Sequence, residues 1–73
     1  MPNSLIFEVE GEVVENLPNT SFRVKLNGSE KVVLCHLAGK MRIHWIRLLP
    51  GDKVRVAMAG PNETLGRIIY KLK

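Results

Sequence analysis

Apolar and charged residues alternate over much of this chain, and that period of two constrains the fold more than any other feature. It is clearest in residues 5–15, where Phe7, Val9 and Val13 fall on one side of an extended chain and glutamates fall on the other. Successive side chains of a strand point to opposite faces, so this pattern predicts a half-buried strand. Four further strands are predicted, over residues 21–26, about 30–37, 53–58 and 65–72.

Residues typical of turns separate the predicted strands. Leu17-Pro18-Asn19-Thr20 ends the first strand, because proline fixes φ and asparagine accepts dihedral angles that most residues avoid. Asn27-Gly28 is the strongest hairpin signal in the chain, and Leu49-Pro50-Gly51-Asp52 fits a type II turn. A glycine inside a strand often marks a bend or a close backbone approach, so Gly11 predicts such a place in the first strand.

The alternation also predicts which side chains form the core. The inward positions of the first, second and fourth strands are Phe7, Val9, Val13, Phe22, Val24, Leu26, Val54, Val56 and Met58. The third strand differs, because Val32-Val33-Leu34-Cys35 is a continuous apolar run. Such a run predicts burial on both faces or a change of face at a bulge. Cys35 lies inside it and is interpreted as a core residue.

Residues 38–47 interrupt the strands and predict a short helical connection that presents a charged tip. Gly39 and Pro50 bracket it, which limits a helix to one or two turns, and Met41 and Trp45 are at helical spacing. With three strands before it and two after, the chain predicts an all-β domain over residues 1–73, a five-stranded Greek-key OB-fold barrel with a short helical turn between strands 3 and 4. An SH3-like barrel has the same strand count and is the rival, but the helical connection favours the OB-fold.

The basic residues are unevenly distributed along the chain. Residues 1–20 hold four glutamates and no lysine or arginine, whereas residues 21–73 hold all 11 basic residues against three acidic ones. A surface polarised in this way indicates a face that meets a polyanion. The alternative, for a chain with a pI near 9.7, is that the charge serves only solubility.

The sequence offers no recognisable catalytic chemistry. Cys35 and His36 are adjacent, and neighbours on a strand point to opposite faces, so they cannot act together as nucleophile and base. One cysteine and two histidines do not supply the ligand pairs of a metal site, and no phosphate-binding loop is present. The glutamates of the first strand are interpreted as its solvent face. We therefore expect no enzyme, no catalytic residues, no metal and no cofactor.

The location of the protein is constrained by two further features. No apolar run approaches the roughly 18 residues of a membrane span, and no signal peptide opens the chain. The single cysteine excludes an internal disulfide and fits a reducing compartment. We expect a monomer without membrane contact, in the bacterial cytoplasm or, as the alternative, in the plastid stroma.

Basic residues on the predicted second and third strands and on the helical connection are candidates for an RNA-binding surface. They are Arg23, Lys25, Lys31, His36, Lys40, Arg42 and Arg47. Contacts from such residues to phosphates give affinity without reading base sequence. Trp45 is a candidate for stacking on an unstacked base, with a hydrophobic plug under the helix as its alternative role. Since aromatic residues are few, the chain suits a folded RNA better than successive bases of a single strand.

Several motifs together resemble those of translation initiation factor 1 of bacteria and plastids. They are Leu17-Pro18-Asn19, Phe22-Arg23-Val24, His36 with Gly39-Lys40-Met41-Arg42, Ile46-Arg47, Gly51-Asp52 and Gly66-Arg67-Ile68. The resemblance implies an OB-fold that binds ribosomal RNA at the aminoacyl site of the small ribosomal subunit and works with the other two initiation factors. It places Lys40, Met41, Arg42 and Arg47 in the segment that inserts into RNA, Arg67 at a further contact, and Arg23 on the sheet.

The chain departs from that family pattern at a few positions. Ala38 stands where a serine is usual, and Ile43-His44-Trp45 stands where a polar or basic residue and a tyrosine are more typical. Two other functions on a similar barrel stay open, a cold-shock-like RNA chaperone and an SH3-like adaptor for proteins. The scarcity of surface aromatics weighs against the first, and the excess of cations over exposed apolar groups weighs against the second.

Overall fold

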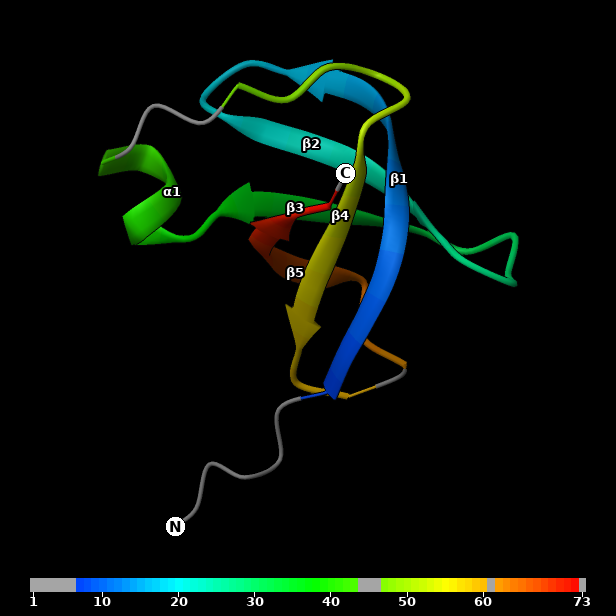
Figure 1. The fold of residues 1–73 in the computed structure, drawn as a ribbon. Helices are drawn as coiled ribbons and strands as arrows, with labels where there is room; N and C mark the ends of the chain where they lie inside the picture. Colours follow the sequence, from blue (N-terminus) through cyan, green and yellow to red (C-terminus); the bar gives the residue numbers. More distant parts are fainter. Residues whose placement is uncertain (1–6, 44–46, 61, 73) are drawn as a thin grey trace, which may run out of the picture.

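A closed barrel of five strands forms the body of the protein (Figure 1). The computed structural model describes residues 7–43, 47–60 and 62–72. Its elements, in chain order, are β1 (Phe7–Leu17), β2 (Ser21–Leu26), β3 (Val32–Leu37), α1 (Gly39–Ile43), β4 (Lys53–Met58) and β5 (Leu65–Lys71). The strands follow one another around the barrel in the order β1-β2-β3-β5-β4. Only the β3–β5 pair is parallel among these neighbours, and the other four pairs are antiparallel. The predicted OB-fold, with one short helical turn between strands 3 and 4, is therefore confirmed.

The observed strands lie close to the predicted ranges. β2 and β4 have the predicted bounds, whereas β1 continues two residues further, to Leu17, and β5 ends at Lys71. β3 begins at Val32, because the chain before it closes the hairpin with β2. There the Leu26 N–H donates to the carbonyl of Lys31 at 3.0 Å. These differences move the ends of elements and leave the order and type of every element as predicted.

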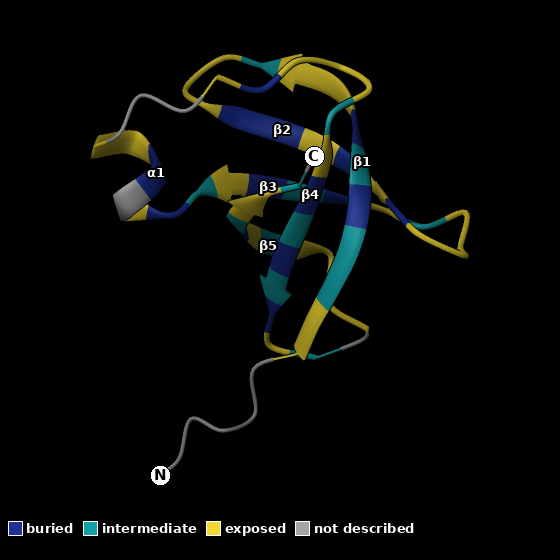
Figure 2. Cartoon of the chain, in the orientation of Figure 1, coloured by how far each residue is buried: buried dark blue, intermediate teal, exposed yellow. Residues whose placement is uncertain are grey.

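The buried residues of the barrel strands, dark blue in Figure 2, are mainly those that the alternation predicts to face inward. The fully buried members include Val13, Val24, Val54, Val56 and Ile68. Phe7 is a correction, because its side chain is 36% exposed near the start of β1, where it faces Met58 at the end of β4. The position lies at the rim of the barrel, so only part of the ring is covered.

The third strand is buried on one face only, which corrects the expectation from its apolar run. Val33 and Cys35 are buried, whereas Val32 is 43% exposed and Leu34 lies at an intermediate depth. The pairing of β2 with β3 runs without a register shift. β3 therefore alternates as an ordinary half-buried strand does, with aliphatic side chains at two of its outward positions, Val32 and Leu34, and His36 at the third.

The predicted turns form, mostly with the backbone conformations that their residues favour. Asn19 and Thr20 adopt positive φ angles of 64° and 55° between β1 and β2, which is well tolerated by asparagine but rare for a β-branched threonine. Gly51 has a φ of 99°, and the Asp52 N–H donates to the Leu49 carbonyl at 3.0 Å, as a type II turn requires. This turn is joined to β1, since the Gly51 N–H donates to the carbonyl of Val13 at 2.8 Å.

Two glycines permit close packing of the barrel. A Cβ atom added at Gly11 would lie 2.6 Å from the carbonyl oxygen of Lys25, which confirms the close approach predicted there. At Gly66 on β5, an added Cβ would lie 2.6 Å from the Val56 side chain, which is a second close approach.

The register of β1 on β2 shifts between Val13 and Glu15, and this irregularity accompanies the curvature of β1 in Figure 1.

The helix α1 lies at the end of the barrel opposite the hairpin that joins β2 and β3 (Figure 1). It is connected to the barrel at Ala38, whose N–H donates to the Ile68 carbonyl at 2.9 Å. The first turn forms when the Met41 and Arg42 N–H groups donate to the Ala38 carbonyl at 3.0 and 3.2 Å. Met41 is 4% exposed and belongs to the core cluster, so it holds the helix against the barrel.

Candidate nucleic-acid interface

Three of the four acidic residues of β1 are paired with basic residues on the neighbouring strands. The pairs are Glu10 with Arg55 at 3.0 Å, Glu12 with Lys53 at 3.5 Å and Glu15 with Arg23 at 3.0 Å. Each pair joins residues that face one another across the sheet. Exposed pairs of this kind contribute only about 0–1 kcal/mol to stability. Their main consequence is that the charge of β1 is locally neutralised.

Five other basic residues have no ion pair with any residue that the structure describes. We name this set the cationic surface, and it consists of Lys25 on β2, His36 on β3, Arg42 on α1, Arg47 after it and Arg67 on β5. All of these side chains are exposed. They are far apart in the sequence, and the β3–β5 pairing brings His36 beside Arg67. The basic residues without an ion pair therefore lie on β2, β3, β5 and the helical connection, and not beside β1.

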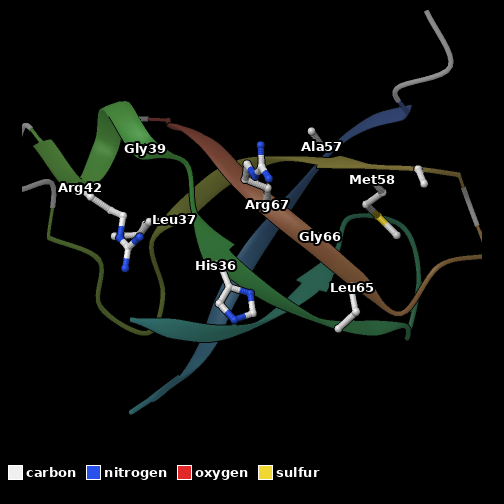
Figure 3. Close-up of a pocket in the computed structure, with 10 residues that line it drawn as sticks. His36, Leu37, Gly39, Arg42, Ala57, Met58, Leu65, Gly66 and Arg67 are labelled. Atoms are coloured by element: carbon white, nitrogen blue, oxygen red, sulfur yellow. The ribbon is translucent and has the colours of Figure 1, made fainter. Parts of the chain in front are cut away.

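Part of the cationic surface surrounds an open hollow of about 710 Å³. Its charged and titratable lining consists of His36, Arg42 and Arg67, and its apolar lining includes Leu37, Met58 and Leu65. Figure 3 shows Arg42 at one end, beside α1, with His36 and Arg67 in the middle and Leu65 toward the other end. No carboxylate lines the hollow among the described residues. The hollow therefore combines donors for phosphate oxygens with apolar walls.

The structure brings together only some of the residues that the sequence predicted as a site. The hollow is lined by three of them, His36, Arg42 and Arg67. Arg47 is exposed and follows α1, and its backbone carbonyl accepts a hydrogen bond from Lys71 Nζ at 3.2 Å. Lys25 lies further along β2, outside the hollow. The side chain of Lys40 and the whole of Trp45 lie outside the described residues, so their predicted contacts stay predictions.

Two predicted site residues have surroundings that the sequence did not indicate. The Met41 side chain is buried in the core, which corrects its expected place on the inserting surface: it packs against the barrel and is not presented outward. Arg23 is exposed on β2, but its guanidinium is bound to Glu15. An RNA phosphate at Arg23 would therefore compete with a carboxylate, whereas at Arg67 it would not.

The apolar lining of the hollow was missed at the level of sequence. Leu65 and Met58 lie on β5 and β4, far along the chain from His36. They line the same hollow as His36 because β5 pairs in parallel with β3, with Leu65 opposite Leu34, and antiparallel with β4, which carries Met58. Nothing local in the sequence signals that pairing, although the topology of an OB-fold does.

Cys35 is a core residue, as predicted. Its side chain is fully buried, and burial raises the pKa of the Cys35 thiol to about 12. A thiol protonated at neutral pH is not a nucleophile.

Within the part of the chain that the structure describes, no three histidine, cysteine or carboxylate side chains gather as a metal site. No helix in the same residues is long and apolar enough to cross a membrane.

A five-stranded OB barrel with a concentrated cationic surface defines a class of small proteins that bind nucleic acid. Comparison with known proteins narrows that class. The family model for translation initiation factor 1A / IF-1 matches residues 2–73. The chain belongs to this family of RNA-binding, ribosome-associated initiation factors of protein biosynthesis. The family expected from the sequence motifs is confirmed.

One solved structure of the family agrees with this assignment, and parts of two other proteins have a similar fold. The solution structure of translation initiation factor 1 from the Wolbachia endosymbiont strain TRS of Brugia malayi has a TM-score of 0.74 at 46% identity, over 96% of this chain and 82% of that one. YjeQ from Thermotoga maritima matches at a TM-score of 0.71 and 28% identity, over 92% of this chain but 23% of its own. YloQ, a circularly permuted GTPase, has a TM-score of 0.72 at 21% identity over 100% of this chain and 25% of its own, and this likeness concerns the fold alone.

Proposed function

We propose that the protein binds the small ribosomal subunit at the aminoacyl site through contacts with ribosomal RNA, and that it assists assembly of the initiation complex together with the other two initiation factors. The observation that carries the proposal is the cationic surface, which has no ion pair with the described part of the chain. The family match supports the ribosome as the target. Residues 1–73 act as one RNA-binding domain, in a monomer of the bacterial cytoplasm or the plastid stroma.

The RNA contacts follow from the chemistry of the side chains. Arg42, Arg47 and Arg67 each present a planar guanidinium that donates to phosphate oxygens and to guanine edges. His36 and Lys25 add donors along the sheet, and Arg23 extends the contact once its carboxylate partner is displaced. Lys40 and Trp45 keep the roles predicted from the sequence, in the segment that follows β3. Met41 acts in this proposal by fixing the position of that segment.

The protein acts by binding and has no catalytic step. No cofactor is required, because the affinity arises from phosphate contacts and from the fit of a folded RNA. Few aromatic side chains are present, so the protein favours a folded site over unstructured RNA. A cold-shock-like chaperone would show the opposite preference.

The test is cosedimentation of the full chain with purified small ribosomal subunits across a salt series. We expect the logarithm of the affinity to fall linearly with the logarithm of salt concentration, by roughly 0.7–0.9 for each phosphate contacted on linear nucleic acid. Chemical probing of the subunit RNA should show protection at the aminoacyl site. A flat salt response would exclude the electrostatic contact, and equal affinity for an unstructured oligonucleotide would favour the chaperone.

A further inference from the structure

Three aliphatic side chains form a stripe on the outer face of β3 and β5. Val32 is 43% exposed, Leu65 is 58% exposed, and Leu34 lies between them at intermediate depth. Val32 and Leu34 are two residues apart on β3, hence on one face, and Leu34 pairs directly with Leu65 across the parallel β3–β5 contact. We call this set, Val32, Leu34 and Leu65, the apolar stripe.

The apolar stripe is poorly suited to nucleic acid. OB-folds commonly bind oligonucleotides on this side of strands 2 and 3, and such surfaces hold bases by stacking them on aromatic rings. Valine and leucine have no π-face to offer. Aliphatic groups gain most by leaving water against another apolar side chain, as in contacts between proteins.

Basic residues border the apolar stripe. On β2, Lys25 faces Val32, and Arg23, whose guanidinium is bound to Glu15, faces Leu34 across the antiparallel pairing. Beyond the stripe, His36 and Arg67 lie side by side at the next outward position of β3 and β5. An apolar centre with a cationic border complements a segment in which apolar side chains are flanked by carboxylates.

We propose that the apolar stripe is the binding surface for an extended, acidic segment of a partner protein, in which leucine-like side chains at alternate positions are followed, two residues further on, by aspartate or glutamate. The spacing follows from the geometry, because an extended chain presents every second side chain to one face, so leucines and a carboxylate two residues apart face the barrel together. The apolar side chains cover Val32, Leu34 and Leu65, and the carboxylate reaches Arg67, which lies at the next outward position after Leu65. This inference goes beyond binding to ribosomal RNA and does not depend on it.

The two binding modes share a border. Arg23, Lys25, His36 and Arg67 lie beside the apolar stripe and are also candidates for RNA contact, whereas Arg42 lies on α1 and Arg47 follows it. An acidic segment on the stripe therefore competes with RNA at these four residues and leaves Arg42 and Arg47 free.

The test is an NMR titration of the full ¹⁵N-labelled chain with synthetic peptides. The probe is a short peptide with leucine at two alternate positions, aspartate at the next two alternate positions and threonine between them, and the matched peptide has serine in place of each leucine, with the same charge. We expect saturable shifts of the amide signals of Arg23, Val32 and Leu65. Because the leucine side chains leave water on binding, the leucine peptide should bind at least about tenfold more tightly than the serine peptide.

Variants locate the contact. The double substitution Val32→Ser with Leu65→Ser should abolish the preference for the leucine peptide. Val14→Ser is the matched control, because Val14 is a strand valine that is also 43% exposed, but it lies at the irregular part of β1. The control should keep the preference. If the double variant does not fold, the comparison of the two peptides on the unaltered chain still decides.

Three results would overturn the proposal. Equal affinity for the two peptides would mean that the bordering charges alone bind them. Shifts confined to Arg42 and Arg47 would place the peptide on the helical side. Stronger shifts at the stripe with a single-stranded oligouridylate than with the leucine peptide would make this face a nucleic-acid surface. None of these results bears on whether the protein binds the small ribosomal subunit.

Discussion

Replacing Arg67 by alanine tests whether the location of a cation, and not the net charge, decides RNA binding. Arg67 is exposed on β5, lines the hollow and has no ion pair within the described residues. Its neighbours across the sheet are His36 on one side and Ala57 on the other. The substitution therefore removes a guanidinium without removing a partner from the fold.

The expected loss of affinity for the small ribosomal subunit follows from the hydrogen bond that the substitution removes. A hydrogen bond to a charged group contributes about 1.5–3 kcal/mol, so Arg67→Ala should weaken binding to the small ribosomal subunit by roughly ten- to a hundredfold. If the guanidinium meets one phosphate, the salt dependence should also become shallower by roughly 0.7–0.9 in the log–log slope. Stability should change by less than about 0.5 kcal/mol, as is usual for exposed positions.

Arg55→Ala is the matched control, because it removes the same charge from the neighbouring strand β4. Arg55 is bound to Glu10 at 3.0 Å and lies outside the hollow. The assay is cosedimentation with small subunits across a salt series, beside thermal melts of both variants. We expect Arg67→Ala to lose affinity and Arg55→Ala to lose little. Equal losses would refute the reasoning, since binding would then follow net charge, and a melting temperature lowered in proportion to the lost affinity would make Arg67 structural.

Three further predictions concern the helical side and the core. Arg42→Ala and Arg47→Ala should each weaken subunit binding roughly ten- to a hundredfold with nearly unchanged melting temperatures, and unchanged binding in both would remove this segment from the RNA contact. Gly66→Ala should lower the stability by about 1–3 kcal/mol in denaturant unfolding, because its Cβ would lie 2.6 Å from Val56, whereas Gly60→Ala, with open space around it, should change the stability little. Cys35→Ser should lower the melting temperature without a specific loss of binding, because a buried hydroxyl needs a new partner, and a stable variant that no longer binds subunits would contradict this.

The fold could be predicted because local signals agree over most of the chain. The alternation in β2 and β4 indicated their bounds, and the turn at Leu49–Asp52 follows from a proline and a glycine in the positions that a type II turn demands. The errors lie where burial depends on distant parts of the chain. Phe7 has the apolar register of a core residue but sits at the rim, and the apolar run of β3 has one exposed face.

The site was predicted residue by residue but not as an arrangement. Charge and motif identified His36, Arg42 and Arg67, yet their convergence on one hollow depends on the parallel pairing of β3 with β5. A strand pairing between residues so far apart has no local signature. The same holds for Met41, whose place in the motif indicated the surface, while the packing of α1 on the barrel directs its side chain into the core.

The register of β1 determines the charge pattern of the whole barrel. Glu10, Glu12 and Glu15 face Arg55, Lys53 and Arg23, so three of the basic residues are neutralised by the strand that carries most of the acidic ones. Such exposed pairs stabilise the fold by only about 0–1 kcal/mol each, so the burial of Val13 and the close approach at Gly11 contribute more to the register than the pairs do. The pairs therefore chiefly determine where on the surface the positive electrostatic potential is strong. With three basic residues neutralised beside β1, a polyanion at moderate salt is attracted toward the β3–β5 side and α1, so the same register that closes the barrel also orients its approach to RNA.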